Sequence, residues 1–277
     1  MGAMDSRPRL VDRAALERLR ARADAPFLRE RVADEVQDRL MEVNRRFTAP
    51  AVVTPFPAPW RDRLPGARIV PDAEALDLGA GAHDLVVHDL CLHWAEDPVG
   101  QIAQCARALR PDGLFLATLF GGATLASLRT ALAEAEAEAA GGLSPRILPM
   151  GEIRDWGDLP GRAGLALPVA DSLPYEVSYA TPLALMRDLR RMGEGNALAR
   201  RLRRVTRRAV ILGAAARYPL APDGRAVARF EVVTLTAWAP APGQPKPLRP
   251  GSAARSLAEG IEAARAGAEA MPRGPKP

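Results

Sequence analysis

The sequence has few of the residues that mark several common classes of protein. It contains two cysteines, Cys91 and Cys105, which lie in core-like segments without CxxC spacing. We therefore expect reduced, packed thiols and neither a disulfide nor a zinc site. No run of about 18 apolar residues is present, so we expect no membrane-spanning helix. The N-terminus is charged, unlike a signal peptide, and we expect a cytoplasmic protein.

Histidine and aromatic residues are also scarce. The only histidines are His83, His88 and His93, which are evenly spaced but alternate between the two faces of a strand. We therefore predict no metal site. A net charge of +5 comes mostly from arginine and suggests an acidic partner without identifying one. Aromatic residues make up 5% of the chain, which disfavours an RNA-stacking surface.

One segment imitates a nucleotide-binding loop. Leu76-Asp77-Leu78-Gly79-Ala80-Gly81 has the glycines of such a loop, which normally follows a strand and opens a helix. Here Asp84–Leu90 follows at once and has the β-branched and leucine-rich composition of a buried strand. The glycines therefore belong to a loop that enters a strand.

The pattern along the chain predicts an α/β fold: a shortened Rossmann-like sheet with N-terminal helices, a helical cap and a C-terminal tail. We expect an N-terminal helical segment over 1–47, an α/β domain over 48–240 with the cap at about 182–216, and a Pro/Ala-rich flexible tail over 241–277. The predicted helices are 12–22, 26–47, 98–109, 123–140, one within 149–163, 182–192 and 196–216. The predicted strands are 51–54, 67–70, 84–90, 114–119, 169–179 and 230–238.

Several blocks in order resemble the class I S-adenosylmethionine (SAM) methyltransferases. They are Asp84–Val87, Leu92–Pro98, Arg110–Phe115, Phe120–Leu125, Gly141–Pro145 and Asp188–Asn196. Within that superfamily they resemble the mitochondrial complex I assembly factor 5 branch, which is related to biotin-pathway carrier-protein methyltransferases. The resemblance implies a respiratory-complex or iron–sulfur context and, in some members, arginine hydroxylation, for which this sequence shows no metal triad.

The chain departs from that family at the cofactor site. Thr54-Pro55-Phe56-Pro57 stands where the family has its glycine-rich loop, and only about thirty residues separate Val53 from Asp84. At least one strand and its helix, assigned to the second strand, must be missing, with Ala67–Asp72 in place of the third. Prolines remove amide donors, and without glycine the backbone cannot approach a ligand closely. We expect no cofactor; if SAM did bind, Thr54, Asp72, Gly121 and Gly122 would surround it.

The candidate pocket residues follow the strand that ends before Asp89. Asp89, His93 and Trp94 would lie at the carboxyl edge of the sheet, where α/β folds bind ligands. His93 is equally well explained as a packed histidine and Trp94 as a lid over the core. Gly121 and Gly122 fit either an anion-binding helix start or a tight turn from strand to helix.

Two further segments are candidates for a pocket cap or a partner-binding surface. Their residues are Pro145, Arg146, Gly193 and Asn196, although helix termination by glycine accounts for part of each segment. Arg200 and Arg204 belong to an arginine-rich predicted helix, for which a solvated face is the simplest explanation. The alternative is docking of an acidic protein or a nucleic acid.

We expect a degenerate methyltransferase-like protein that binds a protein partner, a respiratory-complex or iron–sulfur subunit. The alternatives are an active SAM-dependent methyltransferase with an atypical cofactor site, and a binder of nucleic acid or acidic protein through the arginines. A ligand-sized cavity beside Thr54 would favour the enzyme. Proline and tryptophan filling that volume would favour the binding protein.

Overall fold

The computed structural model describes residues 9–244, 259 and 261. The chain divides into a unit of residues 1–240 and a second unit of residues 241–277, and the six named strands all lie in the first. Most of the predicted tail lies outside the described residues. Within the described part of the chain, no helix combines the length and the apolar character that a membrane crossing requires.

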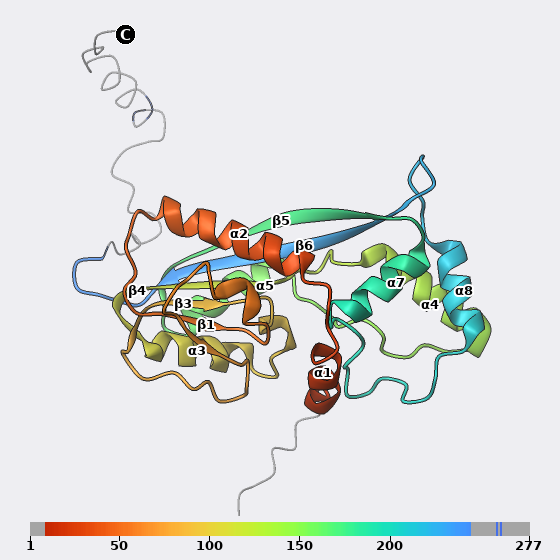
Figure 1. The fold of residues 1–277 in the computed structure, drawn as a ribbon, viewed down its shortest axis with the longest axis horizontal. Helices are drawn as coiled ribbons and strands as arrows, with labels where there is room; N and C mark the ends of the chain where they lie inside the picture. The colour runs from red at the N-terminus through yellow and green to blue at the C-terminus, as the bar shows by residue number, and fades with distance from the viewer. Residues whose placement is uncertain (1–8, 245–258, 260, 262–277) are drawn as a thin grey trace, which may run out of the picture. The chain divides into compact units, whose positions relative to one another are not determined.

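A single six-stranded sheet organises the first unit (Figure 1). Its strands, in chain order, are β1 (Pro50–Val53), β2 (Arg68–Val70), β3 (His83–His88), β4 (Leu109–Phe120), β5 (Ala166–Tyr179) and β6 (Ala226–Trp238). Their order across the sheet is β2-β1-β3-β4-β6-β5. The first four are parallel, and β6 is antiparallel to both β4 and β5. The predicted α/β, Rossmann-like fold is confirmed.

Helices cover both faces of the sheet, and three more lie at one end of it (Figure 1). They are α1 (Arg13–Arg20), α2 (Phe27–Glu42), α3 (Pro98–Ala108), α4 (Ala126–Ala140), α5 (Ile153–Gly157), α6 (Leu159–Arg162), α7 (Pro182–Arg191) and α8 (Arg208–Arg217). Two short 3₁₀ helices, η1 (Ala58–Trp60) and η2 (Leu92–Trp94), follow strands β1 and β3. We call α4, α7 and α8, together with segments 141–150 and 192–207, the cap.

Alternation along the central strands divides the core into two layers. Val86 of β3 packs in the cluster that contains Ile102 of α3, whereas its neighbours Leu85 and Val87 pack in the cluster that contains Val36 of α2. Successive side chains of a strand point to opposite faces, so a continuous apolar run buries both sides of the sheet. A third apolar cluster joins α4, α7 and α8 of the cap to the end of β6.

The first strands differ from the doubly wound pattern. In that pattern the strand beside the first is the second, and a third lies beyond it. Here β2 pairs directly with β1, and no described strand lies beyond it. Segment 67–72 was expected to replace the third strand, but it occupies the position of the second strand. The strand absent from the described residues is therefore the outermost one. The connections 54–67 and 71–82 contain no α-helix and are close to the minimum of about a dozen residues for a parallel crossover.

The predicted helix over 196–216 is wrong in its first half. Segment 199–207 contains no α-helix, and α8 begins only at Arg208. The backbone of Leu198 instead forms an isolated β-bridge with Val11, and Ala199 N donates to Leu10 O at 2.9 Å. Pairing with a segment almost two hundred residues away overrides the local apolar spacing, so the arginines at 200–207 lie on a loop. The predicted helix within 149–163 is two short helices, α5 and α6.

Candidate functional site

The carboxyl ends of β1, β2, β3 and β4 meet at one edge of the sheet, which we call the carboxyl edge. Thr54, Asp72, Asp89 and Gly121 follow these strands, so the fold brings together residues that are widely separated in the sequence. Ligands of open α/β sheets bind outside this edge. The structure fills a large part of it with the protein's own side chains.

Trp60 occupies the space beside β1 where a helix after a glycine loop would lie. The chain leaves β1 through Thr54 and three prolines into η1, and the Trp60 side chain is completely buried against α2 and the sheet. Its indole Nε1 donates to Asp89 Oδ2 at 2.8 Å. No helix N-terminus and no glycine amide therefore face the carboxyl edge at this point.

The Asp89 carboxyl group is bound by other side chains of the protein. It is almost fully buried and also accepts hydrogen bonds from the hydroxyls of Thr54 at 3.1 Å and Thr118 at 3.4 Å. Burial raises the pKa of Asp89, although its hydrogen bonds act in the opposite direction. Thr54 and Asp89 thus tie β1 to β3, and the same geometry leaves neither of them open to a ligand.

Asp72 lies at the end of β2, where the family has the acidic residue that holds the ribose. Its carboxylate is buried and is bound by two arginines of α1. Arg20 NH1 donates to both carboxylate oxygens at 2.9 Å, and Arg13 NH1 and NH2 donate at 3.2 Å. Two positive side chains therefore neutralise the one carboxylate that is placed to receive ribose hydroxyls.

A second buried charge cluster surrounds Glu194, at the start of the cap. Trp94 Nε1 donates to Glu194 Oε2 at 2.9 Å, and the side chains of His93 and Arg29 each lie 3.8 Å from its carboxylate. Burial alone would raise the pKa of Glu194, but His93, Arg29 and Arg20 lower it to about 2. His93 Nδ1 accepts the amide of Phe120 at 3.4 Å, which makes His93 a packed residue bridging β4 and the cap.

Glu194 was missed as an individual site residue. Only its neighbours Gly193 and Asn196 were singled out in the sequence. A carboxylate between two glycines was the available signal. Its partner Trp94 lies 100 residues away in the chain, which no local pattern reveals.

Gly121 and Gly122 form a tight turn from β4 toward α4. The amide of Ala123 donates to the Glu231 carboxylate at 2.9 Å, and Gly121 N donates to Glu231 O at 2.9 Å. A Cβ at Gly121 would lie 2.5 Å from the Glu231 carboxylate, so a larger residue here would displace that side chain. The amides of Gly121 and Ala123 are thus occupied by Glu231.

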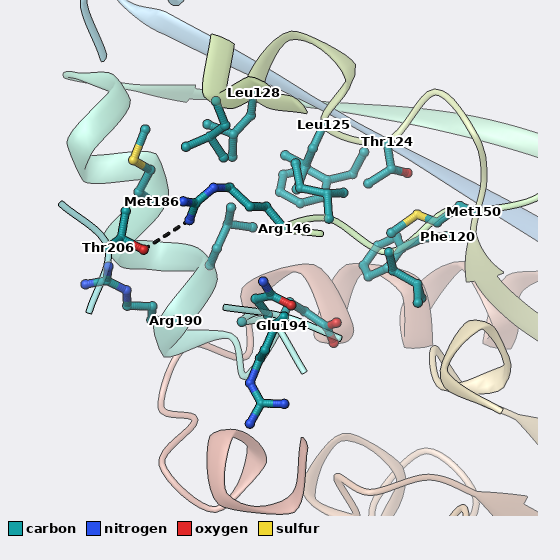
Figure 2. Close-up of a pocket in the computed structure, with 18 of the residues that line it drawn as sticks. Phe120, Thr124, Leu125, Leu128, Arg146, Met150, Met186, Arg190, Glu194 and Thr206 are labelled. Carbon is teal, nitrogen blue, oxygen red and sulfur yellow. Dashed lines mark hydrogen bonds between the residues drawn. The ribbon is translucent and has the colours of Figure 1, made fainter. Parts of the chain in front are cut away.

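A cavity of about 330 Å³ lies between the carboxyl edge and the cap (Figure 2). Trp94 and Phe120 line its sheet side, and Arg146, Glu194 and Asn196 line its cap side. Pro145 accepts a hydrogen bond from Asn196 Nδ2 at 2.8 Å, which joins the two cap segments that the sequence singled out. Gly193 is buried with φ +79°, a conformation that favours glycine.

Arg200 and Arg204 lie on the exposed loop that precedes α8. Arg204 and the largely exposed Val205 line a smaller groove of about 200 Å³ with Leu143. Among the described residues, no group of three or more His, Cys, Asp or Glu side chains has an arrangement suited to a metal ion. Cys91 and Cys105 are free and buried, as the sequence predicted.

Glu136 fixes Arg146 at the cavity wall. Arg146 donates to it through NH2 at 2.5 Å and Nε at 2.9 Å, while Ser144 donates through its hydroxyl at 2.7 Å. The Arg146 guanidinium also donates to Thr206, the bond drawn in Figure 2. These contacts lower the pKa of Glu136 to about 2, and the hydrogen bonds from Arg146 have the largest effect.

The lowered pKa predicts an acid-dependent loss of stability. A carboxyl group whose pKa is lower in the folded chain stabilises it above the ordinary value near 4.5, and that contribution disappears as the pH falls toward 2. We expect Glu136→Gln to lower the free energy of unfolding by about 2 kcal/mol at pH 7 and to have little effect near pH 2. Denaturant titration at both values measures this. Glu138→Gln, on the same helix but exposed, is the matched control; an equal loss at both pH values would contradict the prediction.

Comparisons with known proteins find similar sequences among methyltransferases and an arginine hydroxylase. A family model described as a methyltransferase domain matches residues 38–117. Arginine-hydroxylase NDUFAF5, mitochondrial, from Danio rerio is 36% identical over 71% of this chain and 62% of its own length. A malonyl-[acyl-carrier protein] O-methyltransferase from Xylella fastidiosa is 36% identical over 64% of this chain and 58% of its own length. The chain thus spans less than two thirds of each of these curated relatives.

Among solved structures, 1,6-didemethyltoxoflavin-N1-methyltransferase from Burkholderia thailandensis is similar with a TM-score of 0.38 and 14% identity. That match covers 77% of this chain and 79% of the other.

Proposed function

We propose that this chain, a member of the class I methyltransferase superfamily that resembles its NDUFAF5 branch, is a degenerate methyltransferase-like protein that acts by binding a partner. The observation that carries this proposal is the neutralised Asp72. Arg20 and Arg13 hold the carboxylate that would receive the ribose hydroxyls of SAM.

The other residues at the carboxyl edge also do not fit SAM. The loop after β1 has three prolines and no glycine, so amide donors and close backbone approach are both missing. Trp60 fills the volume beside β1, and Asp89 is committed to Trp60, Thr54 and Thr118. An open groove of about 750 Å³, lined by Pro55, Arg13 and Asp72, does remain beside Thr54. Its volume is ligand-sized, which favours the enzyme, but its only buried carboxylate is the one that α1 neutralises.

Calorimetric titration of the full chain with SAM and with its demethylated product tests this proposal. We expect neither heat nor a thermal shift at concentrations up to about 1 mM, where a Kd corresponds to about −4 kcal/mol. Binding in the micromolar range would overturn the proposal. In that case an Asp72→Asn variant that lost binding would place the cofactor at β2 and support an active methyltransferase.

We further propose that the partner is a protein subunit in respiratory-complex or iron–sulfur maturation, because the resemblance to the assembly-factor branch implies that context. The exposed Arg200 and Arg204 suit an acidic surface on such a partner. The proposal keeps the cytoplasmic location expected from the sequence. Pull-down with wild-type and Arg200→Glu/Arg204→Glu chains measures whether this loop takes part.

A methyltransferase with an atypical cofactor site is the second candidate. The cavity beside β4 favours it, because a pocket of about 330 Å³ is within the size range of small-molecule sites, roughly 300–1,000 Å³. Binding of nucleic acid through Arg200 and Arg204 is a weaker candidate, since no aromatic side chain is exposed beside them on that loop.

A further inference from the structure

The cavity under the cap is built from elements that are distant in sequence and close in space. Phe120 at the end of β4 and Phe230 of β6 form its floor, while Leu128 of α4 and Leu189 of α7 form walls. These four side chains belong to one apolar cluster and are each buried. Figure 2 shows Leu128, Phe120 and Met186 around the same space.

The walls are chemically suited to an apolar molecule. Leu125 and Leu132 of the α4 region extend the apolar lining, and Met150 and Met186 add flexible thioether side chains that adapt to different shapes. An open volume next to buried apolar side chains removes contacts that a close-packed core would have. The volume and the largely apolar lining of the cavity resemble those of small-molecule binding sites.

The charged residues that line the cavity are paired, with one exception. Arg146 is held by Glu136, and Arg201 donates to Asp12 at 2.9 Å. Glu194 is held by Trp94 and the surrounding cations. Arg190 of α7 also lines the cavity, is exposed at its rim, and forms no side-chain hydrogen bond or ion pair with the described part of the chain.

Two further arginines are close in sequence to lining residues, since Arg187 lies one turn from Arg190 on α7 and Arg200 precedes Arg201. Arg187 of α7 and Arg200 of the loop are exposed, and neither is paired with a carboxylate among the residues that the structure describes. A positive rim over an apolar interior favours a ligand with an apolar body and a negative end. The same positive charge disfavours a ligand with an equally long apolar body and a cationic end.

We propose that this cavity binds a small amphipathic carboxylate, with its hydrocarbon chain between α4 and α7 and its carboxylate on Arg190. The proposal goes beyond the partner-binding function and does not depend on it. None of Thr54, Asp72 and Arg20, which decide whether SAM fits, lines this cavity. Carboxylate binding is measured without SAM, so the two results are separable.

Calorimetric titration of the full chain with decanoate tests the site, with decyltrimethylammonium as the probe of equal chain length and opposite charge. We expect decanoate to bind with a Kd below about 100 μM, equivalent to a binding free energy of more than about 5.5 kcal/mol, and the cation to bind at least tenfold more weakly. No decanoate binding at 1 mM, or equal binding of both probes, would overturn the proposal.

Three variants locate the site. Arg190→Gln should weaken decanoate binding about tenfold without weakening binding of the cation, whereas Arg61→Gln, at an exposed position outside the lining, should change neither. Met186→Trp, which fills the cavity from a half-buried position, should abolish decanoate binding. Circular dichroism and the melting temperature check that each variant is folded. Undiminished binding in both Arg190→Gln and Met186→Trp would show that decanoate binds elsewhere and overturn the assignment.

Discussion

Trp60→Ala is expected to lower the free energy of unfolding by about 4 kcal/mol, because removing a buried tryptophan costs roughly 3–5 kcal/mol. Trp60 has no exposed surface and packs against α2 and the central strands. The same substitution removes the indole hydrogen bond to Asp89, whose carboxyl group is buried beside it. A buried polar group that loses its partner adds to the destabilisation.

Urea denaturation of wild type and variants at pH 7 measures this effect. Trp60→Phe retains most of the apolar contact and loses only the hydrogen bond, so we expect a smaller loss of about 1–3 kcal/mol. Arg61→Ala, at the neighbouring exposed position, should change stability by about 0.5 kcal/mol or less. If Trp60→Ala lost less than about 1 kcal/mol, Trp60 would not be filling the space beside β1 as the structure indicates.

The elements that local patterns control were predictable from the sequence. The run Asp84–Leu90 indicated a buried strand, and the structure has β3 over His83–His88. The prediction that the glycines of Leu76–Gly81 lie in a loop entering a strand is also confirmed, since this segment precedes β3 and opens no helix. The absence of a glycine loop after β1 was likewise a local feature, because Thr54 and the prolines are adjacent in the sequence.

The parts that depend on distant contacts were not predictable in the same way. Segment 199–207 has helical apolar spacing but forms a loop, which begins where Leu198 and Ala199 pair with Val11 and Leu10. The arginines that were predicted to lie on one face of a helix therefore lie on a loop. Tertiary pairing overrode a weak local preference, as it does in many proteins.

The same reason explains what sequence reasoning missed at the site. Asp72 was predicted to be one of the residues around SAM if SAM bound, but nothing in the sequence shows that Arg20, 52 residues earlier, would pair with it. Glu194 and the apolar lining of the cavity are assembled from the cap, β4 and β6. Spacing along the chain does not reveal such groups, because the elements that contribute them are far apart in the sequence.

The ion pair between Arg20 and Asp72 is expected to have the second large effect. Both side chains are buried, at 6% and 4% exposure, so a single substitution leaves an uncompensated charge in the interior. We expect Asp72→Leu to lower the free energy of unfolding by about 3–5 kcal/mol, since it leaves Arg20 without its partner. Arg20→Met should have a smaller effect because Arg13 still contacts Asp72.

A double-mutant cycle separates the pair from general disruption of the α1 packing. If the two charges stabilise each other, Arg20→Met combined with Asp72→Leu should be less destabilising than the sum of the single substitutions by about 1–3 kcal/mol. The exposed pair Arg191 and Asp24 is the control, and its cycle should give less than about 1 kcal/mol. Strict additivity at Arg20 and Asp72 would contradict the buried ion pair. It would also remove the observation on which the loss of the SAM site rests, since Asp72 would then be free to receive a ligand.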